Sequence, residues 1–342
     1  MKLQKTLAVL IALGAGLPAL VRAQPTAPIQ QFERTQRELP LRRPGLLNLS
    51  TNTEAPELYP GENTDVGPQR ILRLKPRKTY FEIIADSQFF HTDNALLSDK
   101  TKAGTTLFVN TVQAALAPEA YKLGSGQFSP QLGFRSQWFD YGLSGHDGGL
   151  SHLDFNAQTA FINGRQEWGL WQLFGGLDFT RLLDQHHYAE GYREYVPALG
   201  LQRFFPFGDR LVFAAGSQIG YHFTGVPPPA VAPFYPVSLH VNDRFDCVVN
   251  LSLAYALLPQ LVVQPFYRFQ YCRYPQFSDG FHPVHAREDL IHSVGASLAY
   301  YFKRSVAVRF FTSYEIQDSS YPGSFDYHKF DAGGGATLDV RF

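Results

Sequence analysis

The sequence predicts an all-β fold: a transmembrane antiparallel β-barrel of about 12 strands, preceded by a disordered N-terminal arm. Three observations carry this prediction. From Thr79 onward, apolar and polar residues alternate in repeated segments that are separated by turn residues. The connections between these segments alternate between short and long. Aromatic residues make up 15% of the 342 residues, which suits the aromatic girdles of membrane barrels.

Residues 1–23 have the pattern of a cleaved signal peptide. Lys2 and Lys5 precede the apolar stretch Leu7–Val21, and the small residue Ala23 closes the segment. An N-terminal membrane anchor is the alternative, but a spanning helix needs about 20 apolar residues and the chain has no apolar run of that length. We therefore expect an exported chain.

Residues 24–76 differ in composition from the rest of the chain. They are rich in Pro, Arg, Glu and Gln and show little periodicity, so they lack the apolar surface that folding requires. We interpret them as an extended, disordered periplasmic arm. Its role stays open between a spacer, a plug inside the barrel and a docking strand for a periplasmic partner.

The barrel domain is expected to span residues 77–342. Its segments are ten to fifteen residues long, a length that suits tilted strands crossing a bilayer. The twelve predicted strands are 79–90, 105–117, 127–140, 151–163, 167–181, 192–205, 210–223, 244–257, 261–274, 289–302, 305–317 and 328–342.

The lengths of the connections support a membrane barrel. Short turns such as NGRQ and LPQ follow the fourth, sixth, eighth and tenth strands, and long loops such as 224–243 follow the odd-numbered strands. Only APEAYKLGSG, after the second strand, departs from this scheme. Short periplasmic turns that alternate with long extracellular loops are typical of transmembrane β-barrels, and an even strand count places both barrel ends in the periplasm.

The alternation also assigns faces. In the closing strand, Phe342 and every second residue before it are apolar or small, whereas Asp331, Asp339 and Arg341 lie on the other face. In the fourth strand, the same reasoning points His152, Asp154, Asn156 and Gln158 to the lumen and Leu153, Phe155, Ala157 and Phe161 to lipid. A soluble sandwich would show similar alternation. The loop asymmetry, aromatic content, signal sequence and terminal phenylalanine together favour the barrel.

The closing segment DAGGGATLDVRF, ending in Phe342, resembles the C-terminal signal of Gram-negative outer-membrane β-barrel proteins. The resemblance covers residues 79–342 in architecture. It implies a location in the cell outer membrane, contact with lipid and lipopolysaccharide, and recognition of Phe342 by the barrel assembly machinery. In addition, FFHTDNALLSD is similar to the opening of barrels associated with exopolysaccharide export.

Several charged residues are predicted to line the lumen and to set its selectivity. They are Glu82, Asp86, Arg135, Asp154, Asp178, Arg268, Arg309 and Glu315. Small residues lie between them, as in a water-filled or ligand-holding interior. A lumen filled by its own paired side chains is the equally weighted alternative.

Two cysteines lie on one predicted hairpin. Matching lumen faces across the LPQ turn pairs Asn250 with Arg268 and Asp246 with Cys272, and sets Cys247 opposite Tyr271. One sulfur then points to lipid and the other to the lumen, so we expect free thiols although the periplasm is oxidising.

All eleven histidines are expected in extracellular loops or at the outer ends of strands. His186, His187, His282 and His285 are candidates for a metal-binding or pH-sensitive rim, but their spacing matches no closed metal site. The simpler interpretation is that polar loops collect histidine. We expect no metal and no cofactor.

These observations favour a channel or transport component for small polar or saccharide solutes. A structural anchor that displays binding loops at the cell surface is the main alternative. A lipid- or lipopolysaccharide-modifying hydrolase is disfavoured, because no serine lies opposite His292 on the next strand. A balance of 30 basic and 30 acidic residues argues against a nucleic-acid partner.

Overall fold

The computed structural model describes residues 80–142, 150–225, 240–278, 284–303, 305–321 and 325–342. The predicted signal peptide and arm lie outside these residues. The strands are β1 (Phe81–Thr92), β2 (Thr105–Leu116), β3 (Tyr121–Leu123), β4 (Gly126–Tyr141), β5 (Phe155–Trp168), β6 (Trp171–Asp184), β7 (Glu190–Phe207), β8 (Leu211–Gly225), β9 (Arg244–Leu258), β10 (Leu261–Phe277), β11 (His285–Lys303), β12 (Val306–Ser319) and β13 (Tyr327–Arg341). Within the described residues, no helix is long and apolar enough to cross a membrane.

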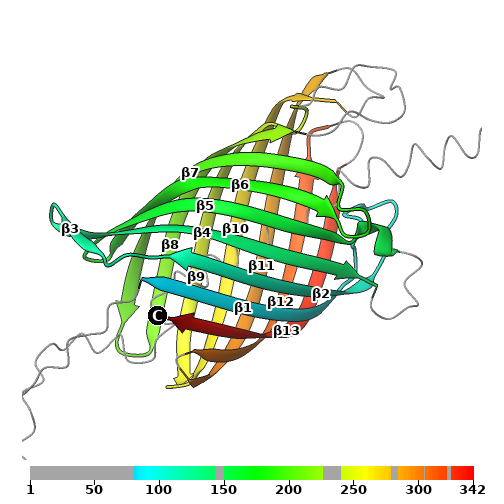
Figure 1. Cartoon of the computed structure of the whole chain (residues 1–342). Coiled ribbons are helices and arrows are strands. Elements are labelled where there is room, and N and C mark those ends of the chain that lie inside the picture. The colour runs from blue at the N-terminus through cyan, green and yellow to red at the C-terminus, as the bar shows by residue number, and fades with distance from the viewer. Residues whose placement is uncertain (1–79, 143–149, 226–239, 279–283, 304, 322–324) are drawn as a thin grey trace, which may run out of the picture.

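Twelve long strands form a closed antiparallel barrel (Figure 1). Each pairs with its neighbours along the chain, and the pairing of β1 with β13 closes the sheet. The short β3 pairs only with β4, while β2 also pairs with β4 and so bypasses it. The predicted twelve-stranded barrel is confirmed, and β3 explains why the connection after the second strand departs from the scheme.

The two ends of the barrel differ as predicted. Short turns join β5 to β6, β7 to β8 and β9 to β10, at the end where Phe342 lies (Figure 1). Gly169 and Gly208 occupy two of these turns with φ values of +58° and +65°, a conformation that glycine adopts without steric cost. The longer connections gather at the opposite end. Below, these are called the short-turn end and the long-loop end.

The predicted fourth strand is wrong in its start and in its faces. Residues Leu150–Leu153 form a 3₁₀ helix, and β5 begins only at Phe155. Phe161 is 5% exposed and Ile162 56% exposed, so the odd-numbered side chains of β5 point inward. The helix carries Leu150 and Leu153 into the barrel, which alternation along one strand does not reveal. The other eleven predicted strands match observed ones, with ends that differ by four residues at most.

The register of the β9–β10 hairpin agrees with the prediction. Asn250 pairs with Arg268, Asp246 with Cys272, and Cys247 with Tyr271. Both cysteines are free. Because the two side chains lie on opposite faces of the sheet, the sulfurs have no geometry for a bond.

Candidate functional site

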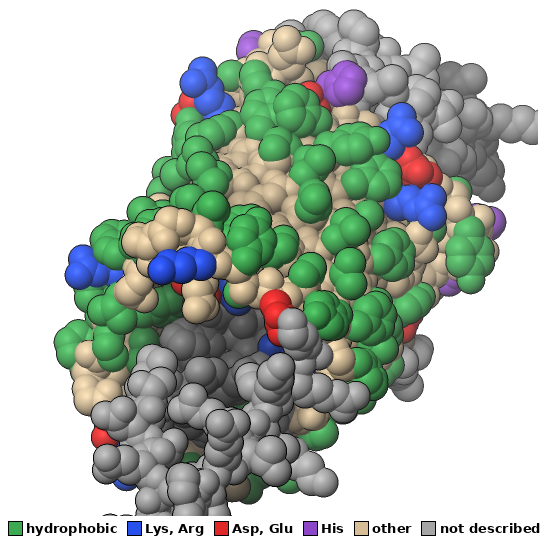
Figure 2. All heavy atoms as spheres, turned by 60° about the vertical axis from the view of Figure 1, so that its left-hand side comes forward, with side chains coloured by type: hydrophobic (Ala, Val, Ile, Leu, Met, Phe, Trp, Pro, Cys, Tyr) green, Lys and Arg blue, Asp and Glu red, His purple; other side chains and the backbone are tan. Residues whose placement is uncertain are grey.

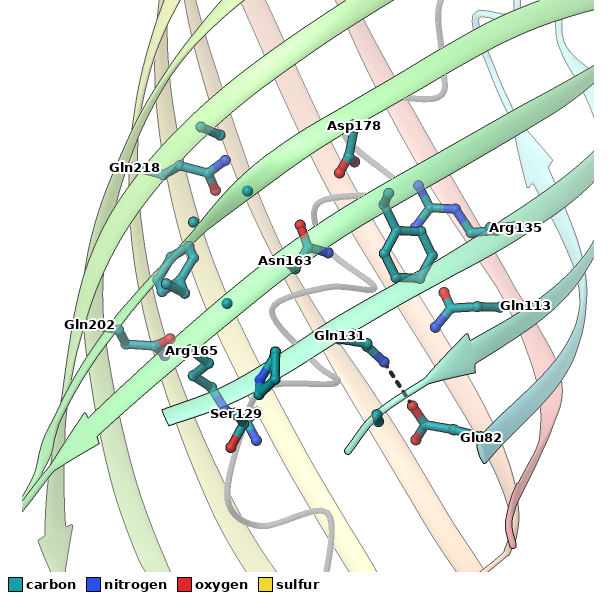
Figure 3. Close-up of a pocket in the computed structure, with 18 of the residues that line it drawn as sticks. Glu82, Gln113, Ser129, Gln131, Arg135, Asn163, Arg165, Asp178, Gln202 and Gln218 are labelled. Carbon is teal, nitrogen blue, oxygen red and sulfur yellow. Dashed lines mark hydrogen bonds between the residues drawn. The ribbon is translucent and has the colours of Figure 1, made fainter. Parts of the chain in front are cut away.

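A cavity of about 400 Å³ occupies the lumen at the short-turn end (Figure 3). Its lining includes Ala117 and Pro118, which follow β2, and Arg341, the last residue of β13. Lining residues come from nine of the twelve long strands. The cavity is therefore a property of the closed barrel and not of one hairpin.

Primary amides dominate the polar lining of this cavity. Six strands contribute one each: Gln113, Gln131, Asn163, Gln202, Gln218 and Asn250. An amide carries both donors and an acceptor without net charge, so it suits hydroxyl-bearing solutes. The aromatic residues Phe161 and Phe174 also line the cavity.

Two of the arginines that line the cavity lie beside a carboxylate. Arg341 lies 2.6 Å from the carboxylate of Glu82, which also accepts a hydrogen bond of 3.1 Å from Gln131 (Figure 3). Arg165 lies 3.0 Å from the carboxylate of Glu167. With Arg135 and Asp178, the lining contains three arginines and two carboxylates, because Glu167 is not among the lining residues.

Seven of the eight charged residues predicted to line the lumen lie on the lumen side of their strands. Glu82, Arg135 and Asp178 line the cavity. Asp86 is 4% exposed, and Arg309 donates to it at 2.9 Å. Arg268 and Glu315 are buried, and Arg268 pairs in register with Asn250 of the cavity lining. Their predicted role in selectivity stays a prediction.

Asp154 departs from the prediction because it precedes β5. Its carboxylate accepts a hydrogen bond of 2.7 Å from the backbone N–H of Tyr141, at the end of β4. Burial raises the pKa of Asp154, and this hydrogen bond opposes the shift. The residue therefore fastens the connection between β4 and β5 and is absent from the cavity lining.

The lumen near the long-loop end is filled on one side by apolar side chains. Phe139 is 0% exposed and its ring stacks on Phe155 at 4.5 Å between centroids. The cluster consists of Phe90, Ala95, Leu107, Val109, Phe139, Tyr141, Leu150, Leu153, Phe155 and Ala157. It is a packed core inside the barrel wall, formed by β1, β2, β4, β5 and the 3₁₀ helix.

An ionic network fills the lumen beside β7, β8 and β9. The imidazole of His222 lies 2.8 Å from Glu194 and 3.1 Å from Asp246. Arg244 donates to Asp246 at 3.1 Å, and Gln270 donates to the same carboxylate at 2.9 Å. All of these side chains are buried or nearly so, which requires that each charge be paired.

A second set of buried charges continues around the wall to β13. Lys329 lies 3.2 Å from Asp331 and 3.8 Å from Glu315. Arg287 donates to Asp289 at 2.9 Å. These side chains are at most 9% exposed, so the described lumen at this level is packed with side chains.

The histidines lie toward the long-loop end wherever the structure describes them. His186 and His187 follow β6, with rings 6.5 Å apart, and His285 begins β11. His282 lies outside the described residues. Within the described part of the chain, no group of three metal-ligating side chains is close enough to hold an ion.

Alternation alone gave incomplete information on the site. It identified the charged lumen residues but assigned Phe155 and Phe161 to lipid, and it did not identify the cavity amides as a group. Sequence reasoning also missed the pairing of Glu194, His222 and Asp246. The sequence does contain a signal for it. Near the outer ends of neighbouring strands, charged residues occupy the alternating positions that point into the lumen.

The outer wall of the barrel is apolar, whereas its interior contains charged and polar side chains beside the apolar cluster. Figure 2 shows hydrophobic side chains over much of this wall. Among the large ones, Phe89, Leu132, Ile162, Leu199 and Phe310 are more than half exposed. Closed barrels with an apolar exterior satisfy every backbone hydrogen bond within a bilayer. The molecule is a transmembrane β-barrel.

Comparisons with known proteins gave distant structural likenesses. No protein-family model and no curated protein sequence matches the chain. Among solved structures, the β domain of the Bordetella autotransporter BrkA is 12% identical, with 77% of this chain and 100% of that chain covered and a TM-score of 0.44. An outer membrane channel from Pseudomonas putida F1 is 11% identical, with 78% and 97% covered and a TM-score of 0.47.

The KdgM porin is 11% identical, with 75% of this chain and 98% of that chain covered and a TM-score of 0.36. At such identities and scores, these likenesses assign no function to this chain.

Proposed function

We propose that this chain is an outer-membrane channel or transport component for small polar or saccharide solutes. The observation that carries the proposal is the cavity in the barrel, with its six amides. Uncharged donors and acceptors beside aromatic rings recognise hydroxyl groups and the apolar faces of sugars.

The packed side chains near the long-loop end form the barrier to passage. A solute in the cavity meets the apolar cluster around Phe139 on one side and the network around Asp246 on the other. Transport then requires that these side chains move. The described conformation corresponds to a closed state in which the cavity is a vestibule.

Conductance of the full-length protein, refolded into a planar bilayer, tests this proposal. Phe139→Ala removes a fully buried ring from the barrier, and Phe134→Ala removes a 48% exposed ring from the outer wall of the same strand. We expect low conductance for the parent chain, a clear increase for F139A and no change for F134A. Liposome swelling with neutral sugars of increasing size then gives the solute range.

If the parent chain and F139A are both folded and neither conducts, the result would contradict a channel. The observation that then favours an anchor with surface loops is the packed outer half of the lumen. An enzyme has less support. His292, the residue considered for a hydrolase, lies opposite Ile316 on β12 and is 2.8 Å from the hydroxyl of Tyr267.

The remaining partners belong to the same proposal. Residues 24–76 would reach a periplasmic partner, and the barrel assembly machinery would read Phe342 during insertion. The backbone N–H of Phe342 donates to the carbonyl of Phe81 at 2.9 Å, so the terminal residue contributes to the seam between β1 and β13.

A further inference from the structure

Two arginines lie directly opposite each other on the outer wall near the long-loop end. Arg181 on β6 pairs in register with Arg193 on β7, and both side chains are exposed. The odd-numbered residues of both strands point outward, as the exposed Leu177 and Tyr195 show. Like charges that face each other across a sheet are destabilising unless something compensates them.

The two guanidinium groups turn away from each other. Arg181 donates two hydrogen bonds, of 2.9 Å and 2.7 Å, to the amide oxygen of Gln158 on β5. The side chain of Arg193 lies on the other side, over Gly225 of β8, where a Cβ atom would come within 2.9 Å of its Nε. The two cations therefore lie toward different neighbouring strands on the outer wall.

The two arginines have one carboxylate between them. Glu190 is 3.8 Å from Arg193, and both side chains are exposed. Asp184 accepts hydrogen bonds from the backbone N–H groups of His186 and His187. A neutral amide, Gln158, is the partner of Arg181, so the pair keeps a net positive charge.

Aromatic rings lie one step closer to the short-turn end. Phe179 and Tyr195 are cross-strand neighbours with ring centroids 4.7 Å apart. Tyr195 is also in register with Phe223 on β8, whose ring is 4.6 Å from that of Tyr221. The wall therefore presents cations at the outer rim and an aromatic band beneath them.

A comparable position elsewhere on the wall is already neutralised. Arg273 on β10 lies opposite Glu288 on β11, also near the long-loop end, with 3.8 Å between their charged groups. There the sheet supplies its own carboxylate. On β6 and β7 the carboxylate position is taken by a second arginine, so an external anion is the missing partner.

We propose that Arg181 and Arg193 bind the phosphorylated disaccharide headgroup of lipid A, with the aromatic band against its sugars and acyl chains. Arginine binds phosphate through paired, charge-assisted hydrogen bonds, and phosphate groups beside the two guanidinium groups offset their positive charge. The site rests on the outer-membrane location proposed above, because lipid A occupies the leaflet at the long-loop end. It does not depend on transport through the lumen.

The test measures binding of purified bisphosphorylated lipid A to the full-length, refolded protein in detergent by native mass spectrometry. The variant R181Q/R193Q removes both charges, and R273Q is the matched control. We expect R181Q/R193Q to lose affinity about tenfold or more and R273Q to bind as the parent chain does. Dephosphorylated lipid A should bind the parent chain as weakly as bisphosphorylated lipid A binds R181Q/R193Q.

Three results would overturn the site. One is equal affinity of R181Q/R193Q and R273Q; another is undiminished binding of dephosphorylated lipid A. The third is equally tight binding of phosphatidylglycerol or full competition by inorganic phosphate, which would indicate a general anion patch. Gel mobility without heating and far-UV circular dichroism confirm that each variant is folded. The conductance of R181Q/R193Q should equal that of the parent chain. Lipid binding therefore tests the lipid A site, and conductance tests the channel separately.

Discussion

Replacing Asp246 with asparagine is expected to destabilise the ionic network in the outer half of the lumen. The carboxylate accepts hydrogen bonds from Arg244 and Gln270 and contacts His222 at 3.1 Å. The side chains of Asp246 and Arg244 are 4% and 6% exposed. The substitution keeps the shape of Asp246 but leaves the guanidinium of Arg244 in a buried site without its nearest counter-charge.

Removing one partner from a buried ion pair costs about 3–5 kcal/mol, because the remaining charge cannot recover its hydration. We expect D246N to lower the free energy of unfolding by an amount in that range. Burial also limits screening, so the loss should change little with salt concentration. Asp318, at the exposed end of β12, provides the control, and D318N should stay within about 0.5 kcal/mol of the parent.

The assay is guanidinium unfolding of the protein in lipid vesicles, followed by the fluorescence of its three tryptophans. A difference between D246N and D318N of less than 0.5 kcal/mol would refute the reasoning. It would mean that water reaches the network and that the outer half of the lumen is not packed. The same result would weaken the proposed barrier to transport.

Three further predictions test closure, thiol state and insertion. Gly333→Ala should prevent the folded, heat-modifiable form on gels, because its Cβ would come within 2.2 Å of a side chain on β1, whereas Gly191→Ala meets nothing within 4 Å and should fold normally. Maleimide should not label Cys272 in the folded barrel, because this residue is 2% exposed. After denaturation without reductant, both Cys272 and Cys247 should be labelled, since both are free. If neither cysteine is labelled after denaturation, the two form a disulfide and the prediction is wrong. Deleting Phe342 should slow insertion by the barrel assembly machinery in reconstituted membranes, and an unchanged rate would contradict its role as the assembly signal.

Most of the fold follows from the sequence because the side chains of a transmembrane strand point alternately to lipid and to the lumen. That constraint gave the twelve long strands, the alternation of short turns and long loops, and the register that separates Cys247 from Cys272. It failed in β5, where the polar residues Asn156 and Gln158 lie on the outward face. There they hydrogen-bond to Ser136 and Arg181, so polarity alone misassigned the face.

Alternation reports which side of the wall a residue faces, and the sequence by itself determined that much about this protein. Only the tertiary structure decided how the lumen is filled. Phe90 and Phe139 meet in one cluster because strands and a 3₁₀ helix distant along the chain converge inside the barrel. The open cavity near Glu82 and the packed network near Asp246 are built from similar polar residues. Their difference depends on the distances between side chains across a closed surface, which a local pattern along one strand does not contain.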